Sequence, residues 1–329
     1  MAESAQIQTA SSNSVPPGTS RGLLEAELKS ERVDPNFILN DTSTFGERPC
    51  VVLNNKEHVV RISSKLSISY QAKLYGRIEV TAKRPYVYRQ DNYTWQQTFK
   101  QELRFLSDQQ CHWHNHPNIV QYHGIAILEE EGECVPYLLL EHVEWNLCSL
   151  LEDKDVKLSQ KHQVFIVHDI ASGLNFLHSR KPRAIVHAAL VTSSVLLNKR
   201  GHAKLSNFFH AGFVDGSLTI KSLHHTPSLN PNHDPCRDGT KLQTSLDMSS
   251  LGSIIKKIDT KHKNRERVKG NILKDLYVLY DCEDGPPQEL SAGEVYRKLV
   301  AYLETPRQEQ HRDSQQKAQG PGQQLSVSA

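Results

Sequence analysis

The sequence lacks the features that would assign it to a membrane, secreted or metal-binding class. No stretch approaches the ~18 consecutive apolar residues that a membrane-spanning helix requires. The start of the chain shows no basic segment followed by an apolar run, so no signal peptide is predicted. The six cysteines include no C-x-x-C pair, which favours reduced thiols over disulfides or zinc ligands. We therefore expect a cytoplasmic protein that does not insert into membranes.

An excess of charge of one sign is missing as well. The 39 basic and 37 acidic residues leave a formal net charge of +2, which predicts no general attraction to nucleic acid. His112, His114 and His116 alternate, but no Cys or acidic ligand stands at a defined spacing from them, so no metal site is predicted. With 37% hydrophobic residues, the chain can bury an ordinary core.

Periodic patterns predict a folded body that mixes strands and helices. Alternating apolar residues from Val59 to Leu74 and from Ile78 to Ala82 predict a hairpin with a Tyr75-Gly76 turn. Ser291 and Glu294 form a capping-box signature at the start of a helix. Apolar positions at helical spacing predict helices over residues 93–107, 158–178, 272–280 and 295–303. The expected fold class is α+β.

The stretch from Ile185 to Gly212 carries a series of motifs in a fixed order. His187, Leu190 and Leu196-Leu197 stand at regular intervals, and Asn207-Phe208-Phe209 follows. This order resembles the catalytic core of the protein kinases, where H-R-D-L-x-x-x-N-x-L-L leads to D-F-G.

Other parts of the chain resemble further kinase motifs. They are Val80-Thr81-Ala82-Lys83 for V-A-I-K, His116–Val120 for H-P-N-I-V, Gly173–His178 for G-L-x-Y-L-H, and Ser245–Gly252 for D-x-W-S-L-G. The resemblance implies that Glu102 pairs with Lys83 and that Asp247 anchors the backbone of the catalytic loop. Val195–Asn198 and the His116 turn are most similar to the tyrosine-kinase and tyrosine-kinase-like groups.

The resemblance implies a bilobal protein-kinase-like fold, with a β-rich N-lobe that includes the αC helix and a shortened, helical C-lobe. We expect an N-lobe over residues 58–140 and a C-lobe over residues 141–305, which together form one kinase-like domain. Residues 1–57 are expected to be an N-terminal extension, largely disordered at its start, and residues 306–329 a disordered tail, since both are rich in small and polar residues.

The groups that the kinase reaction needs are replaced. Ala189 stands where the family has the proton-accepting Asp, and a methyl group cannot accept a proton. Ser194 and Asn207 stand at the two magnesium-ligand positions, and neither carries the charge that offsets the dehydration of Mg²⁺. Glycine is absent from Val51 to Tyr75, so the loop that closely approaches the phosphates is also missing. No catalytic site is expected to be intact, and no metal is expected.

A candidate nucleotide pocket is still implied by the resemblance. Leu140 would be the gatekeeper, Glu141 and Val143 would lie in the hinge, and Lys83 with Glu102 would form an ion pair. Ala82 and Leu196 would sandwich the adenine. Binding of ATP there would be weak and independent of magnesium.

The function that we expect is therefore that of a pseudokinase in signalling, a catalytically defective protein-kinase-like protein. It would act as a protein-binding scaffold or allosteric regulator, without a required cofactor, and its partners would be other proteins, an active kinase among them. One alternative is a residual protein kinase that transfers phosphate from ATP to protein. A second alternative is a metal-independent nucleotide-sensing module.

Overall fold

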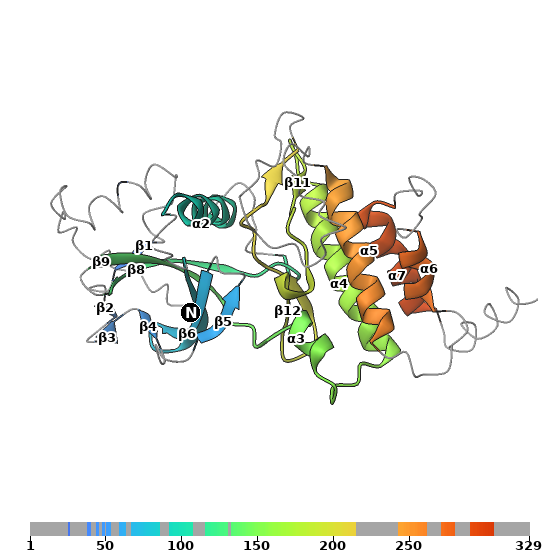
Figure 1. Cartoon of the computed structure of the whole chain (residues 1–329), viewed down its shortest axis with the longest axis horizontal. Helices are drawn as coiled ribbons and strands as arrows, with labels where there is room; N and C mark the ends of the chain where they lie inside the picture. Colours follow the sequence, from blue (N-terminus) through green and yellow to red (C-terminus); the bar gives the residue numbers. More distant parts are fainter. Residues whose placement is uncertain are drawn as a thin grey trace, which may run out of the picture. The chain divides into compact units, whose positions relative to one another are not determined.

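The computed structural model describes residues 26, 38–40, 44–45, 48–49, 51–53, 59–63, 67–85, 92–107, 116–130, 133–214, 243–261, 271–279 and 290–305 (Figure 1). These residues fall into two compact units. The first contains the described residues before residue 116 together with 120–142, and the second contains residues 116–119 and those from Val143 onward. The disorder predicted for the start of the chain and for residues 306–329 concerns residues outside the described ones.

The first unit is built on one sheet, whose strands follow the order β1-β8-β9-β7-β6-β4, with β5 also paired to β6. The strands are β1 (Ile38–Asn40), β4 (Val51–Leu53), β5 (Val59–Ser63), β6 (Ser67–Leu74), β7 (Ile78–Pro85), β8 (Tyr122–Glu130) and β9 (Glu133–Glu141). Two short strands, β2 (Thr44–Phe45) and β3 (Arg48–Pro49), pair only with each other.

The predicted hairpin is confirmed, because β6 and β7 pair in antiparallel register from Leu74↔Ile78 to Ser67↔Pro85. The turn between them has positive φ at Tyr75 (52°) and Gly76 (67°). The sheet also begins earlier in the sequence than His58, since β1 and β4 both join it. Short strands of two or three residues carry too little alternation to be recognised from sequence.

Helix α2 (Asn92–Ser107) belongs to the first unit and contacts β7 and β8. Its buried side chains include Phe99, Leu103 and Leu106, which follow one another at intervals of three or four residues. This spacing places them on one face of the helix and confirms the predicted amphipathic helix. The opposite face of the sheet has its own apolar core, made by the residues Val51, Tyr70, Ala72, Leu74, Val80, Ala82, Ala126, Tyr137 and Leu139.

The second unit consists mainly of helices. They are α3 (Leu147–Glu152), α4 (Gln160–His178), α5 (Thr244–Thr260), α6 (Ile272–Val278) and α7 (Ala292–Glu304). Short strands accompany them: β10 (Trp145–Asn146) pairs with β12 (Val195–Leu197), which pairs with β13 (Ala203–Leu205), and β11 (Ile185–Val186) pairs with β14 (Gly212–Phe213). A 3-10 turn, η4 (Thr192–Ser194), precedes β12.

Helix α4 is the central element of the second unit and contacts α5, α7 and β13. Ser159 caps its first turn by accepting the N–H of His162 at 3.2 Å. The predicted capping box is confirmed at α7, where Ser291 accepts the N–H of Glu294 and donates its own N–H to the Glu294 carboxylate. In the described part of the chain, no helix has the length and the apolar character needed to cross a membrane.

Candidate functional site

Lys83 and Glu102 form a buried ion pair in the first unit. Lys83 Nζ lies 2.6 Å from Glu102 Oε2, and the two side chains are 5% and 3% exposed. Strand β7 supplies the lysine and helix α2 supplies the glutamate. The pairing predicted from the order of motifs is therefore present in the structure.

Ala82 does not share the face of β7 that carries Lys83. Side chains alternate along a strand, so Thr81 and Lys83 point to one face and Val80 and Ala82 to the other. Val80 and Ala82 are fully buried in the apolar core of the sheet. The prediction that Ala82 belongs to the nucleotide pocket with Lys83 is thus corrected, because Thr81 takes that position.

Thr81 is bonded to a residue that follows β9. Its hydroxyl lies 3.2 Å from Nδ1 of His142, directly after the predicted hinge residue Glu141. The backbone N–H of Glu141 donates to the carbonyl of Gln121 at 2.8 Å, and its carboxylate accepts the Gln121 N–H at 3.2 Å. The backbone N–H and the carboxylate of Glu141 are thus both bonded to Gln121.

The other predicted pocket residues are buried apolar side chains divided between the two units. Leu140 lies in β9 of the first unit and is 6% exposed. Val143 and Leu196 lie in the second unit, where Leu196 pairs with Asn146 of β10.

In the second unit, Asp247 holds the loop that follows β11. Its carboxylate accepts the backbone N–H of His187 at 2.8 Å and that of Ala188 at 2.9 Å. His178 Nε2 lies 2.8 Å from the same carboxylate, which is 1% exposed. The predicted anchoring role of Asp247 is confirmed, with His178 as a third partner that sequence reasoning did not identify.

His187 fixes the loop from its other side. Its ring is fully buried, with Nε2 2.9 Å from the Ser206 carbonyl and Nδ1 3.3 Å from the N–H of Ala189. A carbonyl only accepts and an amide N–H only donates, so the proton resides on Nε2. The ring also contacts Phe208 at a centroid distance of 4.9 Å. The loop therefore has a defined backbone conformation.

The three positions predicted to have lost catalytic groups lie on or next to this loop. Ala189 is half-buried and donates only its backbone N–H to His187. Ser194 is fully buried, and its hydroxyl accepts the N–H of Val191 at 2.9 Å and donates to the Val191 carbonyl at 2.8 Å. Asn207 has a positive φ of 65°, a conformation that Asn adopts more readily than most residues.

No carboxylate is available along this part of the chain. From Ile185 to Val214 the sequence contains neither Asp nor Glu. The nearest carboxylate shown to contact the loop, that of Asp247, is occupied by two backbone N–H groups and His178. Among the described residues, no cluster of three or more His, Cys, Asp or Glu side chains could hold a metal ion. The segment can therefore hold a backbone shape, but it supplies no carboxylate of its own to accept a proton or to bind a metal ion.

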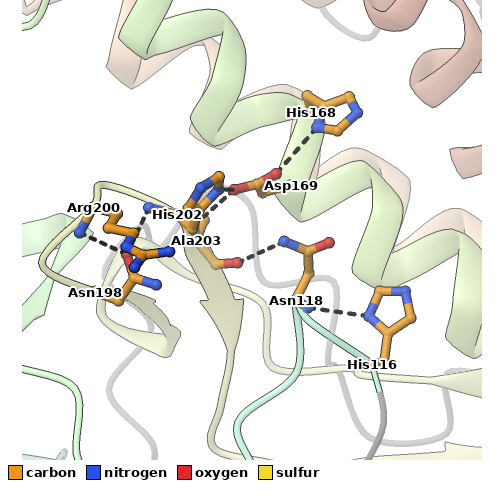
Figure 2. A network of polar contacts seen from close by, with 8 residues as sticks. All are labelled: His116, Asn118, His168, Asp169, Asn198, Arg200, His202 and Ala203. Atoms are coloured by element: carbon orange, nitrogen blue, oxygen red, sulfur yellow. Dashed lines mark hydrogen bonds and ion pairs between the residues drawn. The ribbon is translucent and has the colours of Figure 1, made fainter.

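Asp169 supports the adjoining strand from within α4, as Figure 2 shows. Its carboxylate accepts the Ala203 N–H at 3.0 Å and lies 3.1 Å from Nδ1 of both His168 and His202. Sequence reasoning missed this network, although a carboxylate between the apolar positions Val167 and Ile170 was a signal for it. A buried charge on a core-facing side of a helix requires polar partners.

The turn at residues 116–119 is attached to the same strand (Figure 2). The side-chain amide of Asn118 donates to the Ala203 carbonyl at 3.0 Å. Its backbone carbonyl accepts the Leu205 N–H at 2.9 Å. His116 accepts the Asn118 N–H through Nδ1 at 3.2 Å and stacks on Phe176 at 4.6 Å. Burial, and secondarily the charge of Lys204, lowers the pKa of His116 below its ordinary value.

Comparison with known proteins gives one consistent result. Residues 69–292, more than half of the chain, match the family model described as protein kinase domain. The chain is 30% identical over 215 residues to integrin-linked protein kinase 1 of Arabidopsis thaliana, covering 63% of this chain and 40% of that protein. It is 26% identical over 234 residues to serine/threonine-protein kinase TAO2 of Rattus norvegicus, covering 70% of this chain and 18% of that protein. The chain thus spans less than half the length of either relative, and its predicted likeness to the tyrosine-kinase groups stays a prediction.

Proposed function

The chain belongs to the protein kinase domain family, and from this premise we propose that it is a catalytically defective member, a pseudokinase, that acts by binding other proteins. The observation that carries the proposal is the bonding of Ser194. Its hydroxyl donates its one proton to the Val191 carbonyl and accepts the Val191 N–H with one of its two lone pairs, which supports a structural role in the loop.

Each replaced group has a separate consequence for phosphoryl transfer. General-base assistance contributes roughly 10²–10⁴ in rate, and Ala189 offers none. The metal ions neutralise charge that develops on the transferred group, and the stretch from Ile185 to Val214 has no carboxylate to hold them. Because the losses affect different steps of one reaction, they support loss of transfer more strongly together than singly.

The residues that maintain the fold support a role in binding. Asp247, His187 and the Lys83–Glu102 pair keep buried contacts that stabilise each unit without any reaction. A domain that keeps its fold but cannot transfer phosphate can still present a surface to a partner. We propose that the partner is another protein, with an active kinase among the candidates, that no cofactor is required, and that the protein acts in the cytoplasm as a scaffold or allosteric regulator.

A metal-independent nucleotide-binding module is the second candidate. The intact Lys83–Glu102 pair favours it, because a lysine held in this way could still contact a phosphate. Nucleotide binding is disfavoured by the side chain that accompanies Lys83 on its face of β7. That residue is Thr81 and not Ala82, and its hydroxyl is bonded to His142. Weak binding of ATP without magnesium is the behaviour that this candidate predicts.

The deciding experiment measures phosphate transfer by the purified full chain. ATP with Mg²⁺ or Mn²⁺ is supplied together with generic protein substrates, and a Lys83→Met variant, shown by circular dichroism to be folded under the assay conditions, serves as the control for contaminating kinases. Should that variant not fold, the double variant Lys83→Met/Glu102→Leu takes its place in both measurements. We expect equal background incorporation by both proteins. Transfer by the unaltered chain that Lys83→Met abolishes would establish the rival enzyme, a residual kinase.

Nucleotide binding is measured on the same two proteins. We expect no thermal shift with millimolar ATP or ADP, with or without metal. A shift in the absence of metal that disappears in Lys83→Met would establish the nucleotide-binding module instead.

A further inference from the structure

Residues that precede the kinase-like motifs provide the outermost strand at both ends of the sheet in the first unit. Strand β1 pairs with β8 at one end, and β4 pairs with β6 at the other (Figure 1). An uncovered edge strand presents unpaired N–H and C=O groups to which another chain can add a strand. The segment from Ile38 to Leu53 therefore covers both edges in cis.

The two ends of this segment are attached differently. Strand β4 is antiparallel to β6, with Val51 opposite Leu74 and Leu53 opposite Ala72, and Val51 is buried in the apolar core. Strand β5 continues along the same edge of β6 from Val59 to Ser63. Side-chain burial and a long stretch of pairing thus hold the β4 end.

The β1 end is a short parallel pairing on a firmly held neighbour. Among the described residues, the pairing joins Ile38, Leu39 and Asn40 to Ile125, Ala126 and Ile127. Parallel pairing is slightly less stable per residue than antiparallel pairing. Strand β8, in contrast, pairs with β9 along its length, and its three residues opposite β1 are at most 1% exposed. The edge of β8 is therefore a rigid acceptor, and β1 is its weakly held occupant.

We propose that the outer edge of β8 is a strand-binding site, filled here by the chain's own Ile38–Asn40 and open to an extended segment of a partner protein that displaces it. Addition of a strand to an edge is a recurrent mode of peptide recognition, in which main-chain hydrogen bonds provide the affinity. The cis occupant defines the chemistry of the partner segment: two bulky aliphatic residues followed by a small polar one, running parallel to β8. This inference deepens the proposed non-catalytic role by naming a surface for it.

The cis occupant determines how a competitor behaves. A tethered segment has an effective concentration on the order of millimolar, so a free peptide of the same sequence at micromolar concentration competes poorly with it. A partner must therefore bind the edge more tightly than β1 does in order to displace it. Removal of β1 from the edge removes this competition. The site is therefore revealed by a change within β1 and not by truncation.

The test uses the full chain with Leu39→Pro, because proline has no N–H to donate to a ladder and its ring fixes φ away from the value of a paired strand. The probe is a fluorescent peptide with the sequence of residues 34–44, and its binding is followed by anisotropy. We expect at least tenfold tighter binding by the Leu39→Pro chain than by the unaltered chain. Thr42→Pro, just outside β1, is the matched control and is expected to behave like the unaltered chain.

Two results would overturn the proposal: failure of the Leu39→Pro chain to bind the peptide, or equal binding of a scrambled peptide. Should Leu39→Pro not fold, residue-resolved hydrogen exchange on the unaltered chain decides. Amides of β8 that point to β1 are then expected to exchange faster than those that point to β9, and equal protection would refute a releasable β1. Neither readout depends on phosphate transfer, so failure here is distinguishable from failure of the proposed pseudokinase role.

Discussion

Ser194 and Val191 are bonded to each other three times within one turn. The Ser194 hydroxyl accepts the Val191 N–H at 2.9 Å and donates to the Val191 carbonyl at 2.8 Å, and the Ser194 N–H donates to that carbonyl at 3.0 Å. The position that resembles a metal-ligating Asn thus closes its own loop. Side-chain to backbone bonds of this kind stabilise turns and need no ligand.

Replacement of Ser194 by Ala should therefore reduce stability rather than alter any ligand affinity. The substitution leaves the Val191 N–H without its acceptor in a part-buried loop, which costs about 1–3 kcal/mol. Ser193→Ala is the matched control, since Ser193 is exposed, and it should change the free energy of unfolding by less than about 0.5 kcal/mol. Urea unfolding followed by circular dichroism measures both. Equal losses in the two variants would contradict the structural role.

The sequence was informative where the signal is local or periodic. Helix α4 and the role of Asp247 follow from apolar spacing and from motif order, and both are present. The Asp169 network could not be predicted in full, because its partner Ala203 lies 34 positions away and no pattern links the two. The error at Ala82 arose from reliance on the motif, whereas the two-residue period of a strand already separates Ala82 from Lys83.

The edge strands show a different limit of prediction. A strand of three residues, such as β1, is too short to show a two-residue period, and its place depends on the edge that β8 offers. Which edge is free depends on the whole sheet. The strands of that sheet lie between Ile38 and Glu141, so the sequence of β1 alone does not predict which strand it pairs with.

Removal of one partner of the Lys83–Glu102 pair should destabilise the first unit strongly. Lys83→Met leaves the Glu102 carboxylate, 3% exposed, without its cation, and such a loss costs about 3–5 kcal/mol. Glu102→Leu should cost a similar amount, because it leaves the buried ammonium without its anion. Urea unfolding of each variant measures these losses.

The double variant Lys83→Met/Glu102→Leu distinguishes a pair from two independent contributions. Two apolar side chains of similar size remove both charges, so the double variant should be more stable than either single one. Additive losses would mean that the two residues act independently and would contradict the pairing.

Ala188 occupies a backbone conformation that side chains rarely adopt, with φ at +57°. Ala188→Val should reduce stability by at least about 2 kcal/mol, because a left-handed residue costs roughly 1–2 kcal/mol and a β-branched one more. Ala188→Gly removes the strain but also a buried methyl group that contributes about 0.8 kcal/mol, so it should be nearly neutral. Ala189→Val, at a half-buried neighbour without positive φ, is the control. If the two valine variants unfolded at the same urea concentration, the positive φ of Ala188 would not explain the loss of stability.

His116 should make the second unit less stable in mild acid. Burial lowers its pKa in the folded chain, and its Nδ1 must stay unprotonated to accept the Asn118 N–H. In the unfolded chain a histidine binds a proton near pH 6.5, so below that pH the unfolded state holds more protons than the folded one. By linkage, stability is complete above about pH 6.5 and falls as the pH drops toward the folded pKa.

The change that tests this role is His116→Asn, which keeps an acceptor near the position of Nδ1 but cannot titrate. We expect the fall in unfolding free energy between pH 7.5 and pH 5.5 to be smaller in this variant than in the unaltered chain. His168 and His202, which contact Asp169 in the same unit, are unchanged in the comparison. His162→Asn, at an exposed histidine, is the control and should keep the original pH dependence. Urea midpoints measured at each pH decide, and parallel curves for the unaltered chain and His116→Asn would show that burial of His116 has no influence on stability.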